Sequence, residues 1–279
     1  MRILTPEELA DFRRDGVVHV RRAVDDELVL RIAAAIDRIA SQPPGPDGRR
    51  RGTGLDRHLC ATDDEFRALC TVTGLAAVAA QATGSETIRI YFDQIFIKPA
   101  NSPDAEFAWH QDAPYWPIGG TQVVSTWLSL TANNADSSAL EFVRGSHTWD
   151  TVYRPASADG TRETMNKMWD GFGDLAHSIP DEIIAFEDHP DRYDIVSFDV
   201  EPGDALLFDY RILHRSRGNP TPTDRVAISW RWLGDEAIWD WVRGVDPVIN
   251  PEHTFLQPGD PITDDETFPV VHRVAAATV

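Results

Sequence analysis

From about residue 86 onward, the chain is a succession of short segments with the composition of β-strands. They are rich in Val, Ile, Phe, Trp and Thr, and Gly, Pro, Asn and Asp separate them. The expected strands cover residues 87–98, 105–112, 122–131, 139–143, 194–200, 204–210 and 224–233. Many short strands with turn residues between them favour a β-sandwich or a barrel. We therefore predict a mainly β protein.

The first 85 residues have the pattern of helices. Thr5 and Glu8 form a capping box, which predicts a helix start, and Gly16 predicts the end of that helix. A short strand and three further helices are expected, at residues 17–20, from Asp25 or Asp26 to the Pro-rich stretch at 43–48, at about 63–71 and at 74–83. These residues form a helical N-terminal wrap around the β-rich part.

One domain over residues 1–279 is the simplest organisation. The wrap covers residues 1–85, and a β core covers 86–235. Within this core, residues 148–193 read as an insertion with helical pieces at 161–172 and 180–186, and residues 236–279 read as a C-terminal extension.

The charge balance excludes some classes of partner. The chain carries 26 basic and 45 acidic side chains, a net charge of −19, which repels phosphate backbones and anionic lipid. We expect no nucleic-acid or membrane partner, and a positive pocket would be notable against this background. Two cysteines, no signal-peptide pattern and no long apolar run favour a cytoplasmic protein that acts on a small molecule. The sequence does not indicate an oligomeric state.

The segment Trp109-His110-Gln111-Asp112 contains two candidate metal ligands. In an extended chain, residues two apart point to the same face, so His110 and Asp112 present an imidazole and a carboxylate side by side. Together with a second histidine they would form the facial triad that holds iron(II) in non-haem oxygenases. His-x-Asp alone occurs often by chance, so the prediction depends on the third ligand.

His214 is the candidate for that third ligand. The apolar strand at 205–208 leads toward it, about a hundred residues beyond Asp112. A jellyroll brings such a strand back to the first two ligands. The alternative, a structural histidine, is less favoured because His214 lies at a strand end.

Arg225 completes the pattern. The turn containing Gly218-Asn219-Pro220 folds the next strand back, so that Arg225 would lie near His214 and Ser216. A guanidinium binds a carboxylate through two parallel hydrogen bonds and keeps its charge when buried. 2-Oxoglutarate needs such an anchor at its distal carboxylate, and Ser216 could donate a second hydrogen bond to it.

These motifs resemble the phytanoyl-CoA dioxygenase family, a branch of the iron(II)- and 2-oxoglutarate-dependent oxygenases, in a bacterial-type member. The resemblance covers most of the chain and rests on "LTPEELADFRRDGVVHVRRAV", "QIFIKP", "WHQDAPYWP", "LEFVRGSH", "LLFDYRILHRSRGNP" and "DRVAISWRWLGD". It implies a double-stranded β-helix, or jellyroll, with iron(II), 2-oxoglutarate and dioxygen. The family pattern places the metal ligands at His110, Asp112 and His214 and the cosubstrate contacts at Arg225, Lys98, Ser216, Trp127 and Gln111.

Aromatic and polar residues near the metal motif are candidates for the substrate wall. Alternation along residues 92–98 places Gln94 and Lys98 on one face. Tyr115 and Trp116 directly follow the metal motif. Trp232 alternates onto the same face as Trp230, and the sequence leaves open whether either ring faces the cavity or belongs to the core. We predict Tyr115, Trp116, Gln94 and Trp232 as substrate contacts.

The resemblance implies hydroxylation of an unactivated C–H bond, with succinate and CO2 as co-products. Asp112 argues against a halogenase, because halogenases of this chemistry replace the carboxylate ligand with a small residue. Desaturation, ring formation and epimerisation remain open outcomes. Two alternatives are a non-catalytic metal-binding jellyroll and a cupin-like enzyme without a cosubstrate. Neither requires an anchoring arginine, so Arg225 separates them from the main hypothesis.

Overall fold

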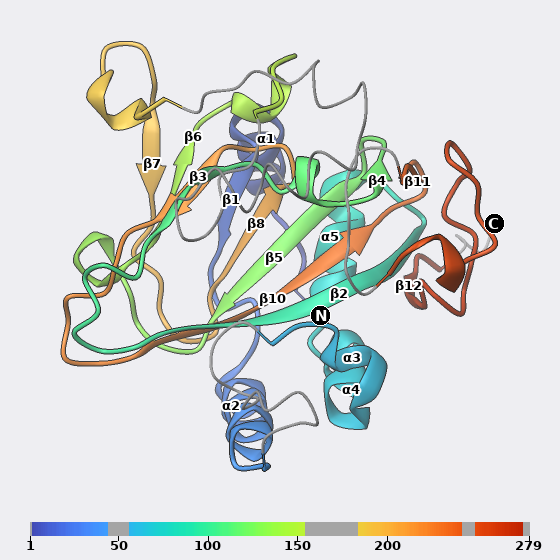
Figure 1. The fold of residues 1–279 in the computed structure, drawn as a ribbon, viewed down its shortest axis with the longest axis horizontal. Helices are drawn as coiled ribbons and strands as arrows, with labels where there is room; N and C mark the ends of the chain where they lie inside the picture. The colour runs from blue at the N-terminus through green and yellow to red at the C-terminus, as the bar shows by residue number, and fades with distance from the viewer. Residues whose placement is uncertain (1, 44–55, 154–183, 242–248, 276–279) are drawn as a thin grey trace.

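Two antiparallel β-sheets form the centre of the protein in the computed structural model, which describes residues 2–43, 56–153, 184–241 and 249–275 (Figure 1). Within these ranges the larger sheet has the order β1-β8-β5-β10-β2-β12. Its strands are β1 (Val17–Val20), β8 (Ala205–Asp209), β5 (Val123–Ser129), β10 (Arg225–Leu233), β2 (Thr87–Lys98) and β12 (Val270–Arg273). The predicted mainly β jellyroll is confirmed.

The smaller sheet has the order β3-β9-β6-β7. Its strands are β3 (Phe107–His110), β9 (His214–Ser216), β6 (Leu140–Val143) and β7 (Ile195–Ser197), and a separate pair joins β4 (Ile118–Gly119) to β11 (Ile238–Trp239). Short 3-10 helices occupy connections at Ala113–Tyr115, Ala135–Ser137, Ser146–Thr148, Phe186–Asp188 and Pro251–His253. Apolar side chains such as Trp127, Phe142 and Phe208 pack together and fill the space between the two main sheets.

The N-terminal helices are α1 (Pro6–Asp15), α2 (Asp26–Ala40), α3 (Leu59–Thr62), α4 (Asp64–Val72) and α5 (Leu75–Thr83). The capping box of Thr5 and Glu8 is present. Gly16 ends α1 with φ 80°, and a Cβ at this position would lie 2.4 Å from the His147 ring, so both backbone conformation and space require glycine. No single helix in the described chain is long and apolar enough to cross a membrane; α4 and α5, bent by 50° relative to each other, reach that length and composition only when counted together.

These helices cover the outer face of the large sheet. Ile32, Phe66 and Leu69 are fully buried in one cluster with Trp230 and Trp232 of β10. In Figure 1, α5 lies against the large sheet, and α2, α3 and α4 lie beyond its lower edge. Burial of this much apolar surface stabilises the sheet from one side, which leaves its other face for the site.

Both edge strands of the large sheet come from outside residues 86–235. β1 pairs with β8, and β12 pairs with β2. Two expected strands are shorter than predicted: β3 ends at His110, and β7 covers Ile195–Ser197. The chain leaves the extended conformation after His110 because a 3-10 turn that contains Pro114 follows. The helix expected at 161–172 and residues 180–183 lie outside the described residues.

Candidate active site

The two histidines of the predicted triad come from neighbouring strands of the small sheet. His110 ends β3 and His214 begins β9, and the two residues are direct partners in the β3–β9 pairing. Their ring centroids are 4.2 Å apart. Asp112 follows two residues after His110, in the turn into the 3-10 helix. Antiparallel pairing therefore brings together ligands that are about a hundred positions apart in the sequence.

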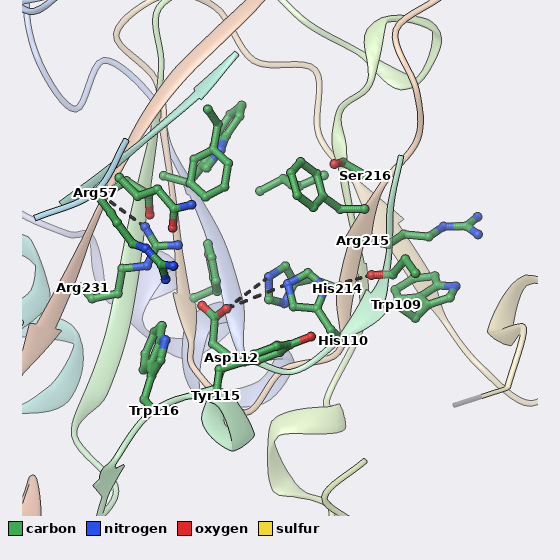
Figure 2. Close-up of a pocket in the computed structure, with 18 of the residues that line it drawn as sticks. Arg57, Trp109, His110, Asp112, Tyr115, Trp116, His214, Arg215, Ser216 and Arg231 are labelled. Atoms are coloured by element: carbon green, nitrogen blue, oxygen red, sulfur yellow. Dashed lines mark hydrogen bonds and ion pairs between the residues drawn. The ribbon is translucent and has the colours of Figure 1, made fainter. Parts of the chain in front are cut away.

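The three side chains converge on one point (Figure 2). Oδ1 of Asp112 lies 3.9 Å from Nε2 of His110 and 4.0 Å from Nε2 of His214. One ligand atom from each residue lies within 4.8 Å of the others. Two imidazoles and one carboxylate are the ligand set of non-haem iron(II) sites with open positions, so this group of residues fits iron.

Hydrogen bonds orient both imidazoles. Nδ1 of His110 lies 2.8 Å from the Ala108 carbonyl, and Nδ1 of His214 lies 3.0 Å from the Ile212 carbonyl. A proton on each Nδ1, donated to these carbonyls, leaves the Nε2 lone pair for a metal. Burial, and next the neighbouring His110, lower the pKa of His214 to about 4. The His214 imidazole is therefore neutral at pH 7, as a metal ligand must be.

The triad opens into a cavity of about 310 Å³. Six further residues that the sequence singles out line this cavity: Arg225, Ser216, Trp127, Gln94, Tyr115 and Trp116. The volume is at the small end of the range for ligand sites and suits a small organic molecule.

Arg225 is a buried cation with no ion-pair partner in the part of the chain that the structure describes. Its side chain is 2% exposed, and Nε and Nη1 have no hydrogen-bond partner among the described residues. The guanidinium lies 5.3 Å from the centroid of the Trp127 ring. Burial lowers the pKa of Arg225 to about 10, so it remains charged at neutral pH. An unpaired buried guanidinium is costly unless a ligand satisfies it, which fits the distal carboxylate of 2-oxoglutarate.

Lys98 lies one layer behind the cavity wall and does not line it. Its Nζ donates to the carbonyl and hydroxyl oxygens of Ser216, at 3.0 and 2.8 Å, and to the Arg217 carbonyl. Burial, and next the charge of Arg225, lower the pKa of Lys98 to about 7. These contacts leave the hydroxyl hydrogen of Ser216 free to point into the cavity. Lys98 therefore holds Ser216 in place. The sequence predicted Lys98 as a direct cosubstrate contact, but its side chain does not line the cavity.

The structure corrects the predicted positions of Gln111 and Trp232, which were expected to contact the cosubstrate and the substrate. The Gln111 side chain points away from its neighbours His110 and Asp112: Nε2 donates to the Arg211 carbonyl at 2.8 Å, and Oε1 accepts from the Tyr153 amide at 2.9 Å. It braces the loops behind the triad. Trp232 is fully buried in the cluster under the helices, and its Nε1 donates to Thr126 at 2.9 Å. Neither residue lines the cavity.

A comparison with protein families decides the identity. The family model described as phytanoyl-CoA dioxygenase matches residues 12–227, which is most of the chain. The chain belongs to the phytanoyl-CoA dioxygenase family. With the His-Asp-His triad in place, it is an iron- and 2-oxoglutarate-dependent oxygenase.

Similar proteins agree with this family assignment. Ectoine dioxygenase from Nocardia farcinica is 26% identical over 235 residues, which is 80% of this chain and 75% of that protein. The solved structure of SnoK, an α-ketoglutarate-dependent carbocyclase from nogalamycin biosynthesis, superposes with a TM-score of 0.71 at 20% identity and covers 96% and 97% of the two chains. EctD from S. alaskensis with 2-oxoglutarate and 5-hydroxyectoine has a TM-score of 0.66 at 20% identity, covering 92% and 86%. At this identity, the two structures show a shared fold.

Three cavity arginines were missed in the sequence analysis: Arg57, Arg215 and Arg231. Arg215 lies on β9, Arg231 lies on β10, and Arg57 forms an isolated bridge with Gln94 of β2. A signal for Arg231 existed: once Arg225 faces the cavity, residues 229 and 231 of the same strand share its face. No local sequence pattern predicts Arg57 as a cavity residue, because its position depends on where the segment before α3 passes over β2.

Proposed function

We propose that the protein hydroxylates an unactivated C–H bond of a small organic molecule with apolar surface. Substrate, 2-oxoglutarate and dioxygen would give the alcohol, succinate and carbon dioxide. The observation that supports this most is Arg225, a buried guanidinium with two unpaired nitrogens facing the cavity that holds the triad. Such a group has a clear role when a dicarboxylate chelates the metal and extends toward it.

Each part of the cavity has a distinct role in this proposal. His110, Asp112 and His214 hold iron(II), which with 2-oxoglutarate and dioxygen supplies the oxidising power for C–H cleavage. Arg225 binds the distal carboxylate of the cosubstrate, and Ser216 donates a second hydrogen bond to it. The indole of Trp127 lies against the guanidinium and excludes water from this end.

Tyr115 and Trp116 form the substrate side of the proposal. Tyr115 follows the triad directly, with its ring 6.0 Å from that of His110. Burial, and next the charge of Asp112, raise the pKa of the Tyr115 phenol, so it stays protonated at neutral pH. Gln94 adds an amide that can donate and accept hydrogen bonds. These residues hold an apolar molecule beside the metal with one polar contact.

The metal ligands favour hydroxylation over halogenation. The carboxylate of Asp112 occupies the position that a halide would need. Ring formation, as the name of SnoK describes for that protein, begins from the same cleavage of a C–H bond. The chain's free, buried Cys60 and Cys70 are consistent with the reducing cytoplasm that we propose as its location.

The test is an anaerobic titration of the purified protein with iron(II) and then 2-oxoglutarate. The complex should show the weak visible charge-transfer band of chelated 2-oxoglutarate. His110→Ala should abolish this band. Arg225→Ala should keep it but raise the 2-oxoglutarate concentration needed by about 10- to 100-fold, because hydrogen bonds to charged groups contribute about 1.5–3 kcal/mol.

Arg217→Met is the matched control. Arg217 is a largely exposed arginine near the same end, paired with Glu141, and its loss should leave the titration unchanged. A wild-type protein that binds iron without the band would contradict the cosubstrate assignment. The metal-binding jellyroll without a cosubstrate would then be the better description.

A further inference from the structure

A second buried arginine lies at the other end of the cavity. Arg231 is 5% exposed, and three aromatic rings surround its guanidinium: Phe92 at 4.8 Å, Phe96 at 5.4 Å and Trp116 at 5.9 Å to the ring centroids. These rings shield the cation from water and also line the cavity. Burial lowers the pKa of Arg231 to about 10, so it is charged at neutral pH.

The hydrogen-bonding capacity of Arg231 is almost unused. Within the described ranges its guanidinium makes one hydrogen bond, a long one of 3.4 Å to the Ser229 carbonyl, and Nε has no partner. Another cavity arginine shows the contrast: Arg215 is held by Glu141 and Glu187. A buried guanidinium without such partners is costly to fold and suits a site that a ligand completes.

The residues around Arg231 make this end of the cavity positive. Asp112 is the only carboxylate among the described residues that line the cavity, and its charge belongs to the metal site. The charge of Asp93 also acts on Arg231, but Asp93 is buried behind the cavity wall, where burial raises its pKa. Arg57 also lines the cavity and lowers the pKa of Arg231 by its charge, which shows that the two cations are close. In a chain with a net charge of −19, two neighbouring arginines in one cavity are a local reversal of the field.

The position of Arg231 favours a role separate from that of Arg225. Six residues of β10 separate them, or about 20 Å between Cα atoms. Arg231 pairs with Ser125, whose hydroxyl lies 3.4 Å from Asp112, whereas Arg225 pairs with Lys98. Figure 2 shows Arg231 and Arg57 on one side of the triad and Ser216 on the other. A dicarboxylate that extends from the metal toward Ser216 and Arg225 therefore points away from Arg231.

We propose that Arg231, assisted by Arg57, binds an anionic oxygen group of the organic substrate, a carboxylate or a phosphate. This inference rests on the proposed function and adds the substrate's charge to it. The guanidinium of Arg231 donates two hydrogen bonds to two oxygens of the anion, and Arg57 contacts the anion from the mouth of the cavity. The apolar body of the substrate then lies along Trp116 toward the metal, which fixes the C–H bond that is attacked.

The test uses three probes of equal chain length: hexanoate, hexyl phosphate and hexan-1-ol. Each is titrated by calorimetry into the anaerobic complex of protein, iron(II) and 2-oxoglutarate. We expect one of the two anions to bind at least about 10-fold more tightly than the alcohol. The tighter anion identifies the oxygen group. Arg231→Met should remove this preference and leave hexan-1-ol binding unchanged, and Arg231→Lys should restore part of it.

Cosubstrate binding separates the two proposals. Arg231→Met should leave the 2-oxoglutarate concentration that gives the half-maximal charge-transfer band within about twofold of wild type, whereas Arg225→Ala raises it. Wild-type protein without the band contradicts the proposed function, and the anion titration then still reports on Arg231 in the metal-free protein.

Two results would overturn the inference. One is equal binding of the anions and the alcohol by the wild type. The other is a loss of 2-oxoglutarate binding in Arg231→Met as large as in Arg225→Ala. If Arg231→Met does not fold, Arg57→Met decides, because Arg57 is exposed and its removal should weaken the binding of the preferred anion alone.

Discussion

The two faces of strand β10 differ in composition and in what they contribute. On the outer face, Trp230 and Trp232 are fully buried against the N-terminal helices, and Nε1 of Trp230 is the one polar side-chain atom of the pair without a hydrogen-bond partner among the described residues. On the inner face, Arg225, Ser229 and Arg231 line the cavity, and each has a polar side-chain atom without a hydrogen-bond partner among the described residues. The outer face buries apolar surface, which stabilises the fold, and the inner face buries polar groups, which destabilises it.

This difference teaches how one strand serves both stability and function. The alternation of a strand separates the two sets of side chains at every second residue. The helices and the outer face supply the stability that allows the inner face to hold unpaired charges. Natural proteins often carry such locally unfavourable groups at functional sites. The following changes test this division, beginning with the largest expected effect.

Trp232→Ala should lower the free energy of unfolding by about 3–5 kcal/mol, the usual cost of truncating a large buried aromatic side chain. The side chain is fully buried and also donates a hydrogen bond to Thr126, so little of the space can collapse. Urea unfolding followed by circular dichroism measures the change. Phe96→Ala is the matched control, because Phe96 is a half-buried ring on the cavity side. Equal losses in both variants would contradict the proposed division between the faces.

Asp112→Ala should affect function far more than stability. Loss of groups that merely orient metal ligands costs about 10- to 100-fold in affinity or activity, so loss of a ligand should reduce iron binding by more than about 100-fold. The melting temperature of the metal-free protein should change little, because among the described residues the Asp112 carboxylate accepts one side-chain hydrogen bond, a long one of 3.4 Å from Ser125. Iron content and a thermal melt measure both quantities. Ser125→Ala, which keeps all three ligands, should lower iron affinity by less.

Much of this site was predictable because its signals are local. His110 and Asp112 are two residues apart in the sequence, on a segment predicted to be extended. The turn after Ser216 reverses the chain and returns Arg225 to the same end of the sheets. The direction in which a side chain points was harder to predict. The family resemblance gave the position of Gln111, but alternation turns it away from its neighbours toward Arg211.

The remaining features depend on pairing between distant parts of the chain. Alternation left Trp230 and Trp232 ambiguous because the sequence alone did not say which face meets the helices. In the structure, both tryptophan side chains pack against the helices. A register shift in the pairing of β10 with β2 lies between Arg231 and Trp232. β1 and β12 join the large sheet from either end of the sequence, and Arg57 reaches the cavity by crossing β2. Short local patterns do not specify such contacts.

Lys98→Met should change how stability depends on pH. The pKa of Lys98 is about 7 in the folded protein, below its ordinary value of 10.5. Between these values the unfolded chain binds more protons than the folded one, so the free energy of unfolding rises with pH. The wild type should therefore gain stability relative to Lys98→Met from pH 7 to about 10, with a slope below about 1.4 kcal/mol per pH unit.

Urea midpoints at several pH values, compared between the two proteins, measure this difference. Groups common to both proteins, such as the buried cysteines, cancel in the comparison. A constant difference across this range would show that Lys98 keeps its ordinary pKa. The cavity side of the large sheet would then hold one buried charge, that of Lys98 on β2, at less cost than we infer.

Ser229→Ala should have the smallest effect on stability and is the most direct probe of the inner face. The Ser229 hydroxyl is fully buried, lines the cavity and has no hydrogen-bond partner in the described part of the chain. Removing an unsatisfied buried hydroxyl should leave the free energy of unfolding unchanged or raise it by up to about 1 kcal/mol. Calorimetric melts of the metal-free protein measure this.

The same variant shows whether the cost of the Ser229 hydroxyl is matched by a ligand contact. Ser229 lies opposite Trp127 in the β5–β10 pairing, between the two arginines along β10. If Ser229→Ala is more stable but binds 2-oxoglutarate or the preferred anion more weakly, the hydroxyl is a ligand contact that the fold tolerates at a cost. If the variant is clearly less stable than wild type, the hydroxyl is already satisfied within the protein. The inner face would then contribute to stability as the outer face does, and the contrast between the two would rest on the arginines alone.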